Sequence, residues 1–435
     1  MSRSRNDLPS YPIQLRRAIA LFLPARGLAI TGPGRWADRF LVLAMLLLVF
    51  SGRSTQKDRF AEARKCLIGM YPSRQRPGTS LAGFMGKMAR QSARLLGLVC
   101  GHLRRQMPQR LGKQWLMYGW RVFGVDGSKM DCPRTKANKE HFKNGGRKKS
   151  GPQLLLVCLI HLGSGLLWSW RQTGARGSER GLLKEMLHDL PDNALLVADA
   201  GFLGFDVLTV ILGRGHSVLM RVGASVCLLK KLGYSVQERA GVVYLWPESK
   251  QKKQQTPLAL RLITVIDGRN RKMCLLTNIL STSALSDAQA VKLYQRRWGL
   301  ELLYRGMKQT LQRRKMLSDA PRHAQVELDW SVLGLWLITH LLWEHRKAKT
   351  PVHEGLAQTL RIVRAAMAGG TDQRRSLALQ LRSIQRDIYQ RKGSKTAVEW
   401  PHKKKDKPCG IPQLRVATKL EVRRAKGVMI LKQAA

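Results

Sequence analysis

Residues 291–315, VKLYQRRWGLELLYRGMKQTLQRRK, contain the residue spacing on which both the fold and the chemistry of this chain depend. At about 100° per residue, a helix places Tyr294, Arg297, Glu301 and Lys308 within about 60° of one another. One carboxylate then lies in a row of cationic and aromatic side chains, which suits a metal-binding acid beside a phosphate track. An ordinary amphipathic helix with solvated charges is the alternative. The apolar face, about 100° away, would consist of Leu293, Leu300, Leu303, Met307 and Leu311.

The charge of the chain independently favours a polyanionic partner. Lys and Arg number 77 against 28 Asp and Glu, which gives a formal net charge of +49. Such an excess favours nucleic acid, because binding releases the counterions condensed on its phosphates. A merely soluble basic protein and a membrane-surface binder are the alternatives. With 435 residues, 44% of them hydrophobic, the chain has room for two or three domains.

Neither secretion nor membrane insertion is expected. The seven cysteines are dispersed without a CxxC pair, which indicates reduced cytosolic thiols. No apolar stretch directly follows the basic residues at the start of the sequence, as it would in a secretion signal. The strongest apolar run, residues 40–50, is eleven residues long and falls short of the roughly 20 that span a bilayer. It predicts a core helix, and we expect a cytoplasmic protein.

Short apolar segments alternate with helical segments from about residue 115 onward. Asp126 lies in the first of them, RVFGVDGS, and Asp199 ends the fourth, in ALLVADAGFLG. Asp126 is therefore expected on the first strand, and Asp199 at the end of the fourth. The predicted strands are 120–128, 154–162, 166–174, 194–201 and 217–223, and the predicted helices between the later ones are 179–190 and 205–215.

These motifs together resemble the IS4 family of DDE transposases. The family signature, Y-x2-R-x3-E-x6-K, is matched by the four residues from Tyr294 to Lys308, and two strand-borne aspartates precede it in the family's order. The resemblance covers about residues 115–345. It implies an α/β fold in which an RNase H-like catalytic domain carries a β-rich insertion and is flanked by helical N-terminal and C-terminal regions.

The expected domain organisation follows from this resemblance and from the helical patterns of the flanks. Residues 1–112 would form a helical domain that binds DNA ends, with a structural or dimerising role as the alternative. Residues 113–345 would form the catalytic domain, with the insertion at about 224–285. Residues 346–435 would form a helical, basic region, and the last 45 residues, with 13 Lys or Arg against 3 acids, would be a flexible tail that attracts DNA.

The resemblance assigns Asp126, Asp199 and Glu301 as catalytic residues and metal ligands. Cleavage and joining of phosphodiesters can use two cations about 3.5–4 Å apart, and carboxylates are the oxygen donors that Mg²⁺ prefers. Mg²⁺ is therefore the expected cofactor, with Mn²⁺ as a substitute. Asp126 could instead form a turn before Gly127. The other nearby acids, expected to face solvent or to cap helices, are Asp131, Asp189, Asp192 and Asp206.

DNA contacts are assigned to four further positions. By resemblance, Arg297 and Lys308 would bind backbone phosphates, and Tyr294 would hydrogen-bond a phosphate or pack against the strand. Trp246 in the insertion would stack a base taken out of the duplex, and its alternative is to fill the core or close the edge of the insertion. Residues 129–149, with 8 Lys or Arg against 2 acids, are a second candidate phosphate track.

The function implied is that of a cut-and-paste DNA transposase, which cleaves the ends of an insertion sequence and joins their 3′-hydroxyls to target DNA. Its partners would be double-stranded DNA and, in the paired-end complex, a second copy of the chain. An RNase H-like nuclease without strand transfer and a catalytically silent DNA-binding descendant are the alternatives. Two histidines, His340 and His345, miss the spacing of a helical zinc pair and are expected in core or surface roles.

Overall fold

The computed structural model describes residues 8–30, 35–74, 76–144, 151–234, 241–266, 272–345, 355–369, 375–384 and 409–433. The chain divides into two compact units, each of which draws on separate stretches of sequence. Helices and strands occur in both units, so the expected mixed α/β class is confirmed. The first unit comprises Met1–Trp115, Gly127–Ser178 and Gly299–Asp387, and the second comprises Leu116–Asp126, Glu179–Trp298 and Ile388–Ala435.

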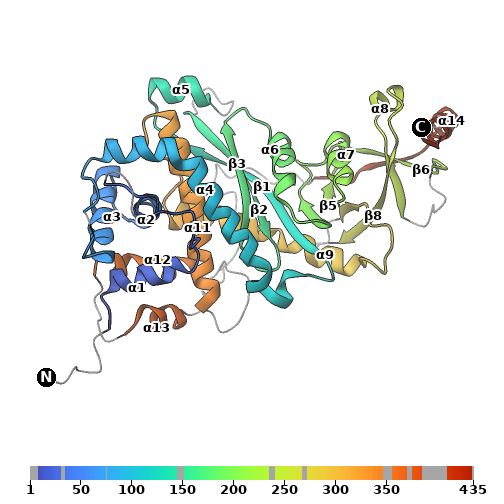
Figure 1. Cartoon of the computed structure of the whole chain (residues 1–435). Helices are drawn as coiled ribbons and strands as arrows, with labels where there is room; N and C mark the ends of the chain where they lie inside the picture. Colours follow the sequence, from blue (N-terminus) through green and yellow to red (C-terminus); the bar gives the residue numbers. More distant parts are fainter. Residues whose placement is uncertain are drawn as a thin grey trace, which may run out of the picture. The chain divides into compact units, whose positions relative to one another are not determined.

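A bundle of helices dominates the first unit. Its helices are α1 (Tyr11–Ala20), α2 (Asp38–Phe50), α3 (Gln56–Met70), α4 (Leu81–Leu111), α5 (Lys136–Phe142), α10 (Trp298–Arg305), α11 (Pro321–His345), α12 (Leu356–Met367) and α13 (Leu377–Arg382). Every residue from Phe40 to Phe50 is buried, because α2 packs against α3, α4, α11 and α12. In Figure 1 the orange helix α12 accordingly lies among the blue N-terminal helices.

The burial of α2 confirms that the apolar run at residues 40–50 is a core helix. Among the described residues, no helix has both the length and the apolar character needed to cross a bilayer. The first unit also contains an antiparallel hairpin of β2 (Gln153–His161) and β3 (Leu167–Gly174), in which Leu154 pairs with Gly174.

A buried ion pair fixes the segment that follows the signature motif in the first unit. The Nε of Arg313 donates to Ser331 Oγ at 3.0 Å, and its Nη1 is 3.9 Å from Glu327 Oε1. Glu327 Oε2 also accepts from the backbone N–H groups of Leu317 and Ser318, each at 2.9 Å. These donors matter because a carboxylate removed from water needs opposite charge and hydrogen bonds. The segment is thereby fastened to α11, which carries Glu327.

The Glu327→Ala substitution should lower the free energy of unfolding by about 3–5 kcal/mol, since it leaves the Arg313 guanidinium buried without its carboxylate. The matched control is Glu248→Ala, which removes an exposed pair with Lys252 and should change the same quantity by less than about 1 kcal/mol. Urea unfolding followed by circular dichroism measures both. Equal, small losses for the two variants would show that the buried pair contributes no net stability.

One extended sheet organises the second unit, in the order β10-β6-β7-β8-β9-β5-β4-β1 (Figure 1). Adjacent strands β1, β4 and β5 are parallel, whereas β5, β9, β8, β7 and β6 are successively antiparallel. The strands are β1 (Arg121–Asp131), β4 (Ala194–Ala198), β5 (Ser217–Val222), β6 (Cys227–Lys230), β7 (Val242–Leu245), β8 (Leu258–Ile266), β9 (Lys272–Thr277) and β10 (Gln413–Val416). The helices are α6 (Glu179–Met186), α7 (Phe205–Gly213), α8 (Glu248–Lys252), α9 (Asp287–Arg296) and α14 (Lys419–Gln433).

Two features of the second unit refine the sequence-based expectations. The predicted β-rich insertion, about residues 224–285, contains β7, β8 and β9, and these strands extend the same sheet that contains β4 and β5. The expectation of a flexible tail is wrong for residues 409–433, which form β10 and α14. The reason is packing, because β10 adds to β6 and α14 buries Ala425 and Val428. Residues 391–408 of the predicted tail lie outside the described residues.

Candidate active site

Asp126, in the middle of β1, and Asp199, directly after β4, lie at the same level of two adjacent strands in the second unit. The parallel pairing of β1 with β4 matches Gly124 with Val197, and each aspartate follows its paired residue by two positions. Side chains alternate along a strand, so an equal offset of two places both carboxylates on the same face. Neighbouring strands are about 4.7–4.9 Å apart. The register therefore brings together two of the three predicted acids.

The turn after β4 holds the Asp199 carboxylate in place. Its Oδ1 accepts a hydrogen bond from the backbone N–H of Gly201 at 2.8 Å. A Cβ at Gly201 would lie 3.0 Å from the same oxygen, so a larger residue there would press on the carboxylate. Arg180 Nε donates to the Gly201 carbonyl at 2.8 Å and fixes the turn from the other side. This explains the Gly two residues after the aspartate in ALLVADAGFLG.

Helix α9 brings the first two signature residues, Tyr294 and Arg297, close to these carboxylates. The helix begins with a capping box of Ser286 and Gln289, which satisfies backbone groups of its first turn. Arg297, directly after the helix, has Nη1 3.7 Å from Asp126 Oδ2, and its guanidinium is 5.6 Å from the centre of the Tyr294 ring. A cation therefore lies between the aromatic ring and one of the two carboxylates.

Burial raises the pKa of the Tyr294 phenol, and nearby Asp199 raises it further, while Arg297 and Arg221 oppose the shift. Tyr294 is only 8% exposed. Arg221 was not identified from the sequence. It is the only charged residue of β5, the strand beside the one that leads to Asp199, and that isolated cation in SVLMRVG was the available signal. The second unit thus gathers two acids, two arginines and a protonated phenol.

The sequence predicted one continuous helix for the signature segment, but the structure divides it into shorter elements. α9 ends at Arg296, Arg297 forms a turn, and α10 runs from Trp298 to Arg305. Residues Gly306–Thr310 then form a π-helical turn, in which Leu311 N–H donates to the Gly306 carbonyl at 2.9 Å. The wider turn changes the angular position of every later residue. The expectation of one regular helix through all four residues is therefore wrong, although the four residues remain candidates.

Glu301 and Lys308 belong to the first unit. Glu301 is exposed in the first turn of α10. Lys308 lies in the π-helical turn, and its Nζ donates to Ser128 Oγ at 2.7 Å. Burial lowers the pKa of Lys308, as does nearby Arg314, while Asp131 opposes both. The second half of β1, which carries Ser128, is thereby tied to the end of the signature segment.

Trp246 is buried, and its predicted role as a base-stacking residue is not supported by its position. The side chain is 3% exposed, and its Nε1–H donates to the Gln255 carbonyl at 2.6 Å. The Trp246 carbonyl accepts from Gln251 Nε2 at 2.8 Å. A ring engaged in this way offers no face to a base, so the structure favours the packing alternative. By contrast, Trp298 at the start of α10 is 59% exposed.

The competing acids have other partners. Asp131 accepts from Gln153 Nε2 at 2.8 Å, and Asp206 forms an ion pair with Lys250 at 2.5 Å. The Lys250 hydrogen bond is the main cause that lowers the pKa of Asp206. His340 is fully buried, and desolvation lowers its pKa to about 3, as expected for a neutral core residue. Within the described ranges, no group of three or more His, Cys, Asp or Glu is close enough to hold a metal ion.

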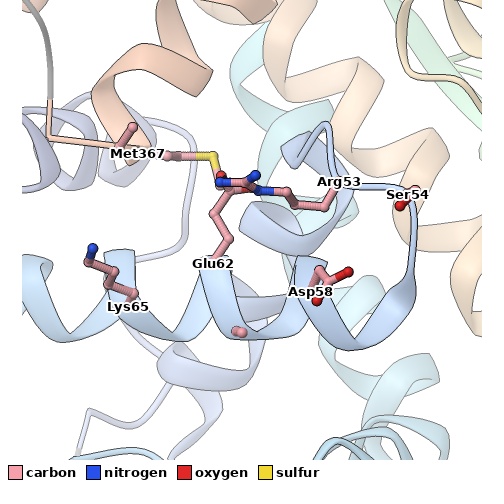
Figure 2. Close-up of a pocket in the computed structure, with 8 residues that line it drawn as sticks. Arg53, Ser54, Asp58, Glu62, Lys65 and Met367 are labelled. Atoms are coloured by element: carbon pink, nitrogen blue, oxygen red, sulfur yellow. Dashed lines mark ion pairs between the residues drawn. The ribbon is translucent and has the colours of Figure 1, made fainter.

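A hollow of about 500 Å³ in the first unit is a separate feature (Figure 2). It lies between α3 and the end of α12, and none of the predicted site residues lines it. Three of its charged side chains have partners nearby: Arg53 pairs with Glu62 at 3.4 Å, and Asp58 accepts from Thr55, the N-cap residue of α3. We therefore do not assign it to the active site.

Comparison with known proteins identifies the family to which this chain belongs. Residues 119–337, half of the chain, match the family described as a transposase DDE domain. The chain therefore belongs to the transposase DDE-domain family, and the predicted resemblance to IS4-type transposases is confirmed.

The chain is also similar to two transposases and to one solved structure. The chain is 29% identical over 230 residues to the transposase InsG for insertion sequence element IS4 of Escherichia coli (strain K12), covering 49% of this chain and 50% of that one. It is 28% identical over 102 residues to the putative transposase InsZ of the same organism, covering 22% and 34%. The chain thus spans half or less of these relatives. A piggyBac transposase synaptic complex with hairpin DNA matches with a TM-score of 0.40 and 11% identity, over 82% of this chain and 76% of that one.

The geometry around Tyr294 predicts a measurable titration. Arg297→Ala should raise the pKa of the Tyr294 phenol further, because it removes the cation that favours the phenolate. Exposed Arg296→Ala, one residue earlier, is the matched control and should leave that pKa where it was. NMR of tyrosine labelled at Cζ, with Tyr294→Phe to assign the signal, measures both. Equal pKa values in the two variants would place Arg297 away from the phenol.

Proposed function

We propose that this protein is a cut-and-paste DNA transposase, which cleaves the ends of a mobile element and joins their 3′-hydroxyls to target DNA. The observation that supports the proposal is the β1–β4 register, in which Asp126 and Asp199 lie at one level of adjacent strands, with Arg297 beside Asp126, in a member of the DDE-domain family. The parallel order of β1, β4 and β5 supports an RNase H-like core. The division into residues 1–112, 113–345 and 346–435 remains a prediction.

Asp126, Asp199 and Glu301 would bind divalent metal, for which Mg²⁺ is proposed and Mn²⁺ would substitute. These residues fit the metal, because carboxylate oxygens are the ligands that Mg²⁺ prefers. Asp126 and Asp199 also lie at the same level of adjacent strands. Bound metal would supply activation of a hydroxyl nucleophile and stabilisation of the leaving oxygen. Glu301 joins the set on the strength of the family signature. The Gly201 N–H would orient one Asp199 oxygen and leave the other available to a ligand.

The cations and the phenol would position the DNA strand. Arg297 and Arg221 supply guanidinium groups next to the aspartates, and such groups suit phosphate oxygens because they donate in pairs. The raised pKa of Tyr294 keeps its phenol protonated, so it can donate a hydrogen bond to a phosphate oxygen. Lys308 would add a further phosphate contact near Ser128. These contacts would hold the scissile strand against the carboxylates.

The proposed partners are double-stranded DNA, both element ends and target, and a second copy of the chain in a paired-end complex, because an element has two ends. A cytoplasmic location in contact with the nucleoid is proposed with them. An RNase H-like nuclease and a silent DNA-binding descendant remain the competing functions. A Mg²⁺-dependent assay on DNA carrying the element's ends separates the three: a transposase cleaves and joins, a nuclease only cleaves, and a silent descendant only binds.

Asp126→Asn, Asp199→Asn and Glu301→Gln should each reduce Mg²⁺-dependent end cleavage at least about 10³-fold while end binding is nearly retained, because affinity comes mainly from the basic surface. Their effects should not add in double variants, since loss of one ligand disables the whole unit. Asp192→Asn, an exposed acid outside the site, is the control. Full cleavage by any of the three would remove that residue from the metal site.

Gly201→Ala tests whether the turn positions Asp199. The added Cβ would lie 3.0 Å from Asp199 Oδ1 and should displace the carboxylate, so end cleavage should fall by at least about tenfold. Gly213→Ala is the matched control, because a Cβ there meets nothing within 4 Å. Cleavage rates and melting temperatures of both variants are compared. Unchanged cleavage by a folded Gly201→Ala protein would show that the position of this oxygen is not critical.

A further inference from the structure

The C-terminal helix α14 presents a row of positive charge on one face. Lys419, Arg423 and Lys426 are all exposed, and their offsets of four and seven residues place them within about 60° of one another on a helix. At a rise of about 1.5 Å per residue, the row extends over about 10 Å along the helix axis. The only acid among Lys419–Val428 is Glu421, which is buried.

The opposite face of α14 packs against the rest of the second unit. Glu421, Ala425 and Val428 are buried, and their helical positions are about 170–230° from the middle of the basic row. One face is therefore used for packing, and the opposite face carries the cations. A flexible basic tail would show no such division, because its charges would have no fixed side.

Glu421 anchors this helix at its first turn. Arg415 donates to its two carboxylate oxygens at 2.8 and 2.6 Å, and Thr418 donates from its backbone N–H at 2.9 Å. Gln251 Nε2, on α8 of the insertion, donates to Glu421 Oε1 at 3.2 Å. The Arg415 hydrogen bonds are the main cause that lowers the pKa of Glu421 to about 2, so the anchor is ionised at neutral pH.

The strand that precedes α14 adds a second attachment. β10 pairs in parallel with β6, matching Gln413 with Cys227. The backbone continues this contact on both sides, since Ala224 N–H donates to the Cys409 carbonyl at 3.0 Å and Ala417 N–H to the Lys230 carbonyl at 2.9 Å. Figure 1 shows α14, in dark red, beside β6 and α8 in olive. The basic row is thus carried on the insertion.

We propose that the face of α14 formed by Lys419, Arg423 and Lys426 is a phosphate-binding surface for duplex DNA, held on the insertion by Glu421. The inference rests on the proposed function only for the identity of the polyanion. A fixed row of cations loses less conformational freedom on binding than a mobile tail does. Its contacts would be to phosphates and therefore independent of base sequence.

Neighbouring arginines provide the first test. Arg423 lies in the row, whereas the exposed Arg424 lies about 100° away on the same helix. The affinity of the full chain for a 30-base-pair duplex is measured by fluorescence anisotropy at several salt concentrations. Arg423→Gln should reduce the slope of log affinity against log salt by about 0.9, and the triple Gln variant of the row by about 2.7. Arg424→Gln should leave it unchanged, and equal slopes for Arg423→Gln and Arg424→Gln would overturn the proposal.

Glu421→Ala provides a test in which net charge and geometry predict opposite results. Removal of an acid adds one positive charge, which alone would tighten DNA binding. If Glu421 fixes the row, the variant should instead bind several-fold more weakly, because the helix loses its anchor. Tighter binding by Glu421→Ala would overturn the proposal of an anchored surface and would support a flexible tail instead. End cleavage by the unsubstituted protein is measured in a separate assay. If the protein binds DNA with the expected salt slopes but does not cleave it, the proposed transposase function is rejected and the proposed DNA-binding surface is retained.

Discussion

The parallel pairing of β1 with β4 is the constraint on which the candidate site depends. Asp126 and Asp199 are 73 residues apart in the chain, and only the pairing of Gly124 with Val197 brings them to the same level of the sheet. A slip of one residue would turn one carboxylate to the opposite face of the sheet. Two ionised carboxylates on adjacent strands would repel each other, and the Arg297 guanidinium, 3.7 Å from Asp126, would offset part of that repulsion.

Deviations from regular helix place the signature residues. The break at Arg297 separates α9 from α10, and the π-helical turn at residues 306–310 changes the phase of the chain before Lys308. A Cβ at Gly306 would lie 2.5 Å from Leu356 Cδ2, so the turn is packed closely against α12. Such turns are frequent at functional sites. Here the turn accompanies the contact of Lys308 with Ser128 on β1.

Buried polar groups fasten segments that are distant in sequence. In the first unit, Glu327 joins the end of the signature segment to α11, and in the second unit Glu421 joins the C-terminal helix to the insertion. Each carboxylate is surrounded by donors from several elements, because an ionised group is stable in a buried position only when it is paired and hydrogen-bonded. Both acids stand in charged stretches of sequence, and neither was identified before the structure.

The sequence by itself determined the family, the core helix at residues 40–50, the strand that carries Asp126, the strand that ends just before Asp199, and the β-rich character of about residues 224–285. The reason is that periodicity and motif spacing are local properties of a chain. Tertiary structure decided the rest. It placed Arg221 beside Tyr294, buried Trp246 in a hydrogen-bonded core position, and fixed the C-terminal strand and helix on the insertion. These outcomes depend on register and on desolvation by segments far away in the chain, and no local pattern specifies either of them.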